Sequence, residues 1–380
     1  MELTFACELD DDKAAWLQAA HPECNLIFRN VAELSRHRAW NRVSRDYDLV
    51  PPVDLWVAGF VCTDKSKLNR NSAANIDCIR NNTGASGTTF HYALAYLKAC
   101  QPAAFLLENV KELRNKKGAE FGDLEFCIQE LEAIRNSVSC QSYSACEHGS
   151  PAERVRCYIR GFMGAAQAKL QHCHAIASMV KIGRLPQTLF LGGDSFSDFE
   201  QINIDPIVKG GCRVADPDWG DKHLEAFREA QLAYPPNFED FPDAFSRAVL
   251  PLEGREREVA AYAELTLPWP DKLGVVQFFD INQSLQWLVG NSGSNFFSEH
   301  CQTIAGSSRI WAGVQLSEAE KRWALLPGSV LMKMTGYPGT PHQSTNSSLM
   351  SSLAGNAFNA FSLGPILMGY CSVAKNSHAA

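Results

Sequence analysis

Two short and nearly continuous apolar runs most constrain the fold of this chain, because each ends at a chemically reactive side chain. The first, Asp54-Leu-Trp-Val-Ala-Gly-Phe-Val-Cys62, ends at a thiol, and the second, Ala104-Phe-Leu-Leu-Glu108, ends at a carboxyl group. Runs of this kind are typical of buried strands in a parallel sheet. Neighbouring parallel strands end at the same edge of a sheet, which is where ligands bind. The sequence therefore places Cys62 and Glu108 in one candidate site.

The same rhythm of apolar runs and helix-like segments extends over residues 1–162 and predicts an α/β fold with a parallel sheet. The expected strands are Leu3–Cys7, Leu26–Phe28, Leu55–Ala58, Phe105–Leu107 and Cys157–Ile159, and the expected helices are Asp12–Ala20, His91–Ala99 and Asp123–Arg135. Residues 163–320 are rich in Gly, Pro, Asp and aromatic residues and predict a second, irregular domain. Compact motifs return over residues 321–380, which we expect to pack back on the first domain.

Composition favours a large globular protein, because 46% of the 380 residues are hydrophobic. No apolar run reaches the roughly 18 residues of a membrane span, and the first residues lack a signal-peptide pattern, so we expect a soluble, intracellular protein. The 13 cysteines are odd in number and scattered, which predicts reduced thiols. Their spacing does not suggest a metal site. A formal net charge of -7 argues against a protein that coats nucleic acid non-specifically.

Basic residues nevertheless gather in two places: Arg29, Arg36, Arg38, Arg42 and Arg45 form one cluster, and Lys65, Lys67 and Arg70 follow Cys62. Each cluster is either an ordinary solvated face or a contact surface for nucleic acid. A nearby lysine would also increase the thiolate fraction of Cys62.

The residue types at the candidate site favour covalent chemistry on carbon. A cysteine thiolate is a soft nucleophile, and a buried carboxyl group such as Glu108 can act as a general acid. Arg154 and Arg156 alternate along an expected strand, so their guanidinium groups would share one face and bind a phosphate or a base carbonyl. The alternatives are a buried structural thiol, a helix-capping carboxylate and a surface arginine pair.

In this order the motifs resemble those of the cytosine-C5 methyltransferase family, over most of residues 1–162 and again near the carboxyl terminus. Ala58-Gly-Phe-Val-Cys62 with Ser66 resembles the family's Pro-Cys nucleophile loop, with Val61 at the usual proline and Thr63 at the usual glutamine. Four further segments resemble later motifs: Ser86-Gly-Thr-Thr-Phe, Glu108-Asn109-Val110, Pro151-Ala-Glu-Arg154-Val-Arg156 and Gly355-Asn356-Ala357. In the third of these, Ala152 replaces a glutamine. Ser307-Ser-Arg-Ile-Trp311 and Thr335-Gly-Tyr-Pro338 are similar to a weaker motif.

The resemblance implies a Rossmann-like sheet that binds S-adenosylmethionine and a target-recognition domain over residues 163–320. Glu8 would hold the cofactor ribose, and Asn30, where aspartate is usual, would accept from the adenine amino group. The other cofactor positions implied are Leu9, Val31, Gly59, Val61, Thr89, Asn356 and Ala357. Ser66, Asn109 and Val110 would contact the substrate.

The mechanism that the resemblance implies uses Cys62, Glu108, Arg154 and Arg156 as catalytic residues. Cys62 would attack C6 of a cytosine flipped out of DNA, Glu108 would protonate N3, and the arginines would hold the base. The resemblance also implies a nuclear location. Two alternatives are open: an inactive relative that binds nucleic acid or a protein, and methylation of transfer RNA, since one branch of the family modifies RNA.

The chain departs from the family at its amino terminus. The family opens with an Asp-x-Phe-x-Gly-x-Gly strand and loop that contacts the methionine part of the cofactor, and Leu3 begins one strand later. We expect its loss to weaken cofactor binding, because a glycine turn lets the backbone approach a ligand closely.

Overall fold

The structure is a computed structural model that describes residues 1–66, 75, 77–116, 121–134, 136–164, 166–191, 219–250, 252, 254–266, 269–282, 285, 301–338 and 347–377. The chain divides into two compact units. Unit 1 comprises Met1–His148, Val155–Lys181 and Ser362–Ala380, and unit 2 comprises Gly149–Arg154 and Ile182–Phe361. This structural division differs from the expected boundaries at residues 162 and 320. The functional division drawn from the sequence stays a prediction.

The first sheet of unit 1 has the strand order β1-β2-β3-β4. The parallel strands β1 (Ala6–Cys7) and β2 (Ile27–Phe28) are joined through helix α1 (Asp11–Ala20), whose first turn is capped by the Asp10 side chain. The short helix η1 (Val31–Arg36) then leads to an antiparallel hairpin of β3 (Arg38–Asn41) and β4 (Asp46–Leu49). The sequence did not predict this hairpin, because its strands are rich in charged residues.

The second sheet of unit 1 has the order β5-β6-β8-β7. Strand β5 (Leu55–Gly59) continues through helix α2 (Gly84–Cys100) to the parallel strand β6 (Ala104–Val110), which confirms the predicted βαβ unit. Strands β8 (Val155–Met163) and β7 (Asn136–Ser144) pair antiparallel, so the sheet is mixed. The short helices η2 (Lys111–Arg114) and η3 (Ala145–His148) follow β6 and β7.

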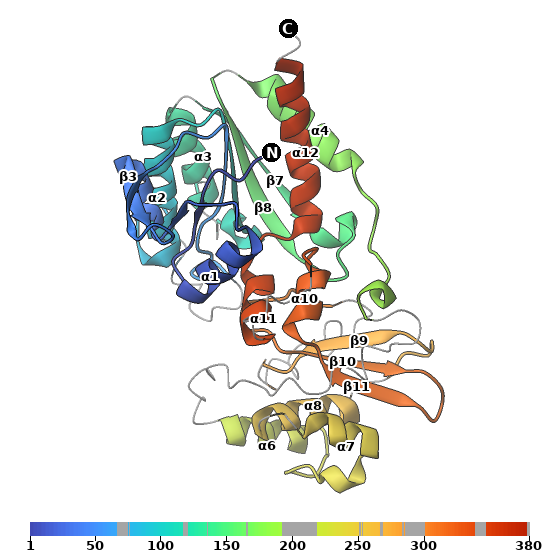
Figure 1. The fold of residues 1–380 in the computed structure, drawn as a ribbon. Coiled ribbons are helices and arrows are strands. Elements are labelled where there is room, and N and C mark those ends of the chain that lie inside the picture. The colour runs from blue at the N-terminus through green and yellow to red at the C-terminus, as the bar shows by residue number, and fades with distance from the viewer. Residues whose placement is uncertain are drawn as a thin grey trace. The chain divides into compact units, whose positions relative to one another are not determined.

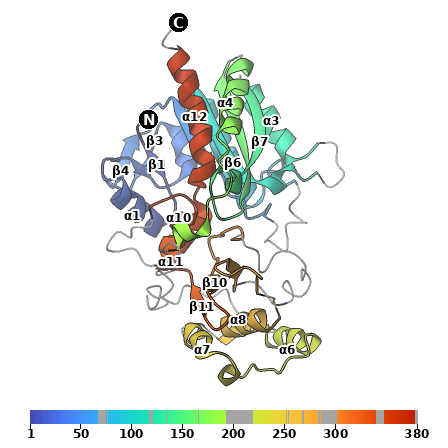
Figure 2. The same ribbon diagram turned by 90° about the vertical axis from the view of Figure 1, so that its right-hand side faces the viewer.

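Helices cover both faces of the second sheet, with α2 and α3 (Asp123–Ala133) on one side and α4 (Gln167–Met179) and α12 (Ala360–Ser377) on the other (Figures 1 and 2). On the α2 side a continuous apolar core joins the two sheets, since Phe28 of β2 and Phe105 of β6 belong to it. On the other side the Tyr370 hydroxyl of α12 donates to the Phe105 carbonyl at 2.6 Å. Both sheets are therefore parts of one layered α/β body.

Unit 2 is more regular than the sequence predicted. Its described part contains an antiparallel sheet of the order β11-β10-β9, formed by Lys321–Leu325, Ile310–Gln315 and Val276–Asp280. Its helices are η4 (Gln187–Phe190), α6 (Trp219–Glu229), η6 (Phe238–Asp240), α7 (Asp243–Val249), α8 (Gly254–Thr266), α10 (Gly328–Met334) and α11 (Ser347–Asn356). Aromatic residues that suggested loops instead form a core, in which Phe245 stacks on Phe241 and contacts Trp323.

Candidate active site

The thiol of the sequence analysis follows β5, and the carboxyl group lies near the end of the neighbouring parallel strand β6. Strands β5 and β6 pair in a register that sets Gly59 opposite Glu108, and the chain reaches Cys62 three residues after Gly59. Cys62 and Glu108 are both partly buried. The prediction that the two groups lie at adjacent strand ends is therefore confirmed.

Hydrogen bonds from two elements fix the turn that carries Cys62. The amide of Asn109 donates to the Phe60 carbonyl at 3.0 Å, and the Thr89 hydroxyl of α2 accepts from the Val61 N–H at 3.0 Å. Within the turn, the Ser66 N–H donates to the Cys62 carbonyl at 2.9 Å. Asn109 is 1% exposed, so a buried amide links the end of β6 to the turn after β5. This arrangement restricts the directions that the thiol can take.

Two acids hold the residues after Cys62. Asp64 accepts from the Ser86 N–H of α2 at 2.8 Å, and its own N–H donates to the Ser86 hydroxyl at 3.2 Å. Lys65 is 6% exposed and forms an ion pair with Asp123, which is fully buried at the start of α3. Asp123 thus balances the charge of Lys65, and the prediction that a lysine increases the thiolate fraction of Cys62 stays a prediction. Lys67 and Arg70 lie outside the described residues.

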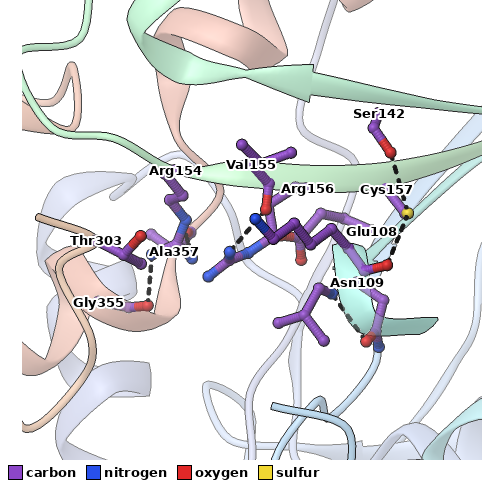
Figure 3. A network of polar contacts seen from close by, with 12 residues as sticks. Glu108, Asn109, Ser142, Arg154, Val155, Arg156, Cys157, Thr303, Gly355 and Ala357 are labelled. Carbon is purple, nitrogen blue, oxygen red and sulfur yellow. Dashed lines mark hydrogen bonds and ion pairs between the residues drawn. The ribbon is translucent and has the colours of Figure 1, made fainter. Parts of the chain in front are cut away.

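Glu108 has a cationic partner in the neighbouring strand. Arg156 of β8 places its Nε 3.0 Å from Glu108 Oε1, and both side chains are 14% exposed (Figure 3). The second carboxyl oxygen of Glu108 has no partner in the part of the chain that the structure describes. Arg156 Nη1 donates to the Val155 carbonyl at 2.9 Å, and Nη2 has no described partner. The pair therefore orients the acid while leaving one oxygen and one nitrogen for a ligand.

Arg154 does not share the environment of Arg156. It precedes β8 rather than lying within it, so the expected alternation of two arginines along one strand is wrong. Its side chain is buried in unit 2, where Nη1 donates to the carbonyls of Ile304 and Gly355 at 2.9 Å (Figure 3). Nη2 donates to the Ala357 carbonyl at 3.0 Å. Arg154 thus joins two distant segments of unit 2.

Asn356 and Ala357, both expected to line the cofactor, lie at the end of α11 in unit 2. Asn356 donates to the Ser352 carbonyl at 2.8 Å, and the Ala357 carbonyl accepts from Arg154. Before them, Gly355 has no room for a side chain, because a Cβ there would lie 2.0 Å from the backbone of Ala305. The glycine of the Gly-Asn motif therefore permits the close backbone contact that Arg154 bridges.

Arg42 holds the segment that follows β1, a role that the sequence did not indicate. Its Nη2 donates to the Leu9 carbonyl at 2.7 Å, its Nε donates to the Glu8 carbonyl at 3.2 Å, and it forms an ion pair with Asp11. One arginine of the first basic cluster is therefore engaged within the fold. The sequence signal that could have found it is the pair Asp11 and Asp12 at the start of α1, whose negative charges attract a nearby cation.

The side chains at the ends of β1 and β2 fit the adenosine part of S-adenosylmethionine. Glu8 Oε1 accepts from the Asp10 N–H at 2.9 Å, and Oε2 has no described partner, so it can accept from a ribose hydroxyl. Leu9 is 66% exposed beside it and, with partly buried Val31, offers apolar surface to a purine. The side-chain oxygen of Asn30, Oδ1, caps η1 by accepting from the Ala32 N–H at 3.0 Å and retains a second lone pair. These groups suit the nucleoside.

Among the described residues, no group of three or more His, Cys, Asp or Glu side chains is arranged to hold a metal ion. In the same part of the chain no single helix has the length and hydropathy of a membrane span, although the bent pair Ser347–Asn356 and Ala360–Ala374 together meets those two criteria.

Comparisons with known proteins agree with the motif pattern. Residues 1–187 match the family model described as C-5 cytosine-specific DNA methylase. The chain is 34% identical over 129 residues to the DNA (cytosine-5-)-methyltransferase DMT5 of Cryptococcus neoformans var. grubii, which covers 34% of this chain and 5% of that protein. It is 33% identical over 114 residues to the type II methyltransferase M1.ScrFI of Lactococcus lactis subsp. cremoris, which covers 30% of this chain and 26% of that protein.

The matched segments thus span only a small part of the length of these relatives. Among solved structures, the Dnmt2 methyltransferase of S. pombe aligns over 97% of this chain and 90% of its own, at 12% identity and a TM-score of 0.45. The family model and the ordered motifs agree, and residues 1–187 of this chain belong to the C-5 cytosine-specific DNA methylase family.

Proposed function

We propose that this chain transfers a methyl group from S-adenosylmethionine to C5 of a cytosine in DNA, with Cys62 as the nucleophile. The observation that carries the proposal is the parallel pairing of β5 with β6, which brings the Cys62 turn and Glu108 to one sheet edge. Family membership supports the reaction class. DNA is favoured as substrate because one curated relative is named a DNA (cytosine-5-)-methyltransferase. A nuclear location belongs to the same proposal.

Cys62 would make C5 of the base reactive. C5 of cytosine is a weak nucleophile, and addition of a thiolate to C6 increases the electron density at C5. The fixed turn around Cys62 reduces the entropy lost when the sulfur aligns with C6. S-adenosylmethionine supplies an electrophilic methyl group when it is bound, and Glu8, Asn30 and Leu9 would hold its nucleoside. Loss of the C5 proton then allows the thiolate to leave.

Glu108 and Arg156 would act together on the other side of the ring. The unpartnered oxygen of Glu108 would hold a proton at N3 while the sulfur–carbon bond forms. Arg156 Nε keeps the carboxyl group in place, and Nη2 would donate to the base carbonyl. The base must leave the stacked duplex to reach these groups. Arg154 would act indirectly, through its hydrogen bonds to backbone carbonyls of unit 2.

The proposal is tested by trapping the covalent intermediate. A DNA duplex that contains 5-fluorocytosine is incubated with the protein and S-adenosylmethionine, and the complex is resolved on a denaturing gel. Fluorine cannot leave as the C5 proton does, so the wild-type protein should accumulate a protein–DNA adduct. Cys62→Ser should abolish it, whereas Cys146→Ser, a matched change at another partly buried thiol, should not.

An adduct that persists in Cys62→Ser would contradict the assignment of the nucleophile. No adduct with any variant would contradict the enzymatic proposal and favour a protein that binds nucleic acid without catalysis. A parallel reaction with 5-fluorocytosine in transfer RNA decides the substrate, because an adduct formed there and not on DNA would replace DNA methylation with RNA methylation.

A further inference from the structure

Two cysteines on adjacent strands contact the same arginine, and both are distant from Cys62 in the sequence. Strands β7 and β8 pair so that Cys140 faces Ile159 and Ser142 faces Cys157. Because side chains alternate along a strand, Cys140 and Cys157 are diagonal neighbours on one face of the sheet. Both thiols belong to unit 1.

Arg114, at the end of η2, contacts both sulfurs. Its Nε lies 3.3 Å from Cys157 Sγ and its Nη2 lies 3.4 Å from Cys140 Sγ. The Ser142 hydroxyl lies 3.4 Å from Cys157 Sγ (Figure 3). The guanidinium also donates to the Cys140 carbonyl at 3.1 Å, which fixes it against the strand. We propose that Cys140 and Cys157 form a site of reversible thiol oxidation, in which a hydroperoxide converts the pair to a disulfide.

The electrostatics of the pair favour one negative charge. The hydrogen bond from Cys140, with those from Ser142 and Arg114, lowers the pKa of the Cys157 thiol to about 6, although burial opposes this shift. The same hydrogen bond raises the pKa of Cys140. One proton is therefore shared between two sulfurs near neutral pH, and the anion is stabilised by the arginine. Thiolates in such cationic environments are the cysteines that react with oxidants.

Solvent has access to one side of the pair. Cys157 is fully buried, but Cys140 is only partly buried, and Arg114 and Ser142 are exposed. A molecule as small as hydrogen peroxide can therefore reach Cys140, which becomes the attacking thiolate when its proton moves to Cys157 along their shared hydrogen bond. Buried Cys157 is then the second thiol, which attacks the sulfenic acid formed on Cys140.

The oxidation of the pair proceeds in two steps. The thiolate sulfur attacks one peroxide oxygen, the O–O bond breaks, and hydroxide leaves to be protonated to water. The resulting sulfenic acid is attacked by the second sulfur, whose proton leaves with the sulfenic hydroxyl as a second water. Two thiols are oxidised by two electrons in total, and one hydroperoxide is reduced.

The position of the pair explains why the disulfide would be reversible. Diagonal neighbours in a sheet have Cα atoms about 7–8 Å apart, whereas relaxed disulfides need about 4.4–6.8 Å. The bond would pull the strands together, and strained disulfides are more easily reduced. Cys157 lies opposite Asn109 and next to Arg156, so the strain would reach the Glu108 pair if the proposed function is correct.

The thiol chemistry is tested without the proposed nucleophile, in full-length Cys62→Ser protein. The protein is exposed to hydrogen peroxide at pH 7, the remaining thiols are alkylated, and peptides are mapped by mass spectrometry. A Cys140–Cys157 crosslink that dithiothreitol removes is expected, with Cys100 as the internal control, since burial raises the pKa of that partly buried thiol. Loss of both thiols at the rate of Cys100, or no crosslink, would overturn the proposal.

The role of the arginine is tested separately. Arg114→Gln should slow oxidation of the pair by about tenfold, because it removes the charge that stabilises the anion. Arg80→Gln, at another arginine of unit 1 that is paired with Asp77, should leave the rate unchanged. Circular dichroism confirms that each variant is folded. In Cys157→Ser, dimedone should label Cys140 as a sulfenic acid. Equal rates of thiol oxidation in wild type, Arg114→Gln and Arg80→Gln would contradict the proposed site.

Discussion

Residues 60–66 and residues 8–11 both follow parallel strands of unit 1, but contacts of different kinds hold them. The first segment, the nucleophile turn, is fixed by buried groups: Asn109 is 1% exposed, and Lys65 is 6% exposed against a fully buried Asp123. The second, the adenosine segment, follows a strand of two residues and is held by Arg42 in bonds that are largely exposed.

This difference shows how the two sheets of unit 1 can serve two purposes. Buried polar contacts are strong when satisfied and expensive when broken, so they fix one geometry. Exposed contacts exchange readily with water and ligands, and each contributes little to the free energy of unfolding. We therefore expect changes at the nucleophile turn to affect stability and reactivity together, and changes at the adenosine segment to affect ligand binding almost alone.

The largest effect should come from Asp123→Ala. It removes the partner of buried Lys65 and the acceptor of the Ile79 and Arg80 N–H groups, which lie at 3.3 and 3.0 Å. A buried charge left without its partner costs about 3–5 kcal/mol of the free energy of unfolding. Urea unfolding monitored by tryptophan fluorescence measures it. Asp12→Ala, the same change at an exposed site on α1, is the control, and equal losses in both would break the comparison.

A smaller loss is expected for Asn109→Ala, which removes the amide bond to the Phe60 carbonyl. An unsatisfied buried acceptor costs about 1–3 kcal/mol. The turn should also loosen, so the rate at which iodoacetamide alkylates Cys62 should change, as followed by peptide mapping. Asn25→Ala, at an exposed asparagine of unit 1, should alter neither quantity. An unchanged Cys62 rate in a destabilised Asn109→Ala protein would show that the amide stabilises the fold without positioning the thiol.

The sequence indicated the strand ends of the nucleophile turn because local patterns specify them. Apolar runs that end at Cys62 and Glu108 are visible without any tertiary information, and the register of β5 with β6 agrees with them. The partners of the turn were not visible. Lys65 reads as a solvated charge after a strand, and its ion pair depends on Asp123, which the fold brings from α3.

Polar strands and tertiary contacts account for the other differences. Strand β7 (Asn-Ser-Val-Ser-Cys-Gln-Ser-Tyr-Ser) and the β3–β4 hairpin contain too few apolar residues for their alternation to predict strands. The sequence suggested that Arg154 and Arg156 share one face of a strand. Arg154 instead donates to the carbonyls of Ile304 and Gly355. Such partners are set by packing between segments that are far apart in the sequence, which periodicity does not encode.

The adenosine segment is tested by Glu8→Ala. The free energy of unfolding should change by less than about 0.5 kcal/mol, because among the described residues the carboxylate accepts one exposed, local hydrogen bond, from the Asp10 N–H. Binding of S-adenosylhomocysteine, measured by calorimetry, should weaken about tenfold, since the charge-assisted hydrogen bond from the ribose to Glu8 Oε2 is lost. Glu2→Ala, at an exposed acid that precedes β1, is the matched control. Equal affinities of both variants would contradict the assignment of Glu8.

The smallest effect should be a pH dependence at the same segment. The hydrogen bond and charge of Arg42 hold the pKa of Asp11 below its usual value of 3.8. A carboxyl group whose pKa is lower in the folded state stabilises it fully above pH 3.8, and this contribution is lost as the pH falls through the folded pKa. The urea midpoint of wild type should therefore slightly exceed that of Asp11→Asn at pH 7, and the two should converge below pH 3.8. Asp12→Asn is the control. A difference that stays constant from pH 7 to pH 2 would mean that Arg42 holds the segment through the Glu8 and Leu9 carbonyls alone, and that the exposed ion pair contributes nothing to it.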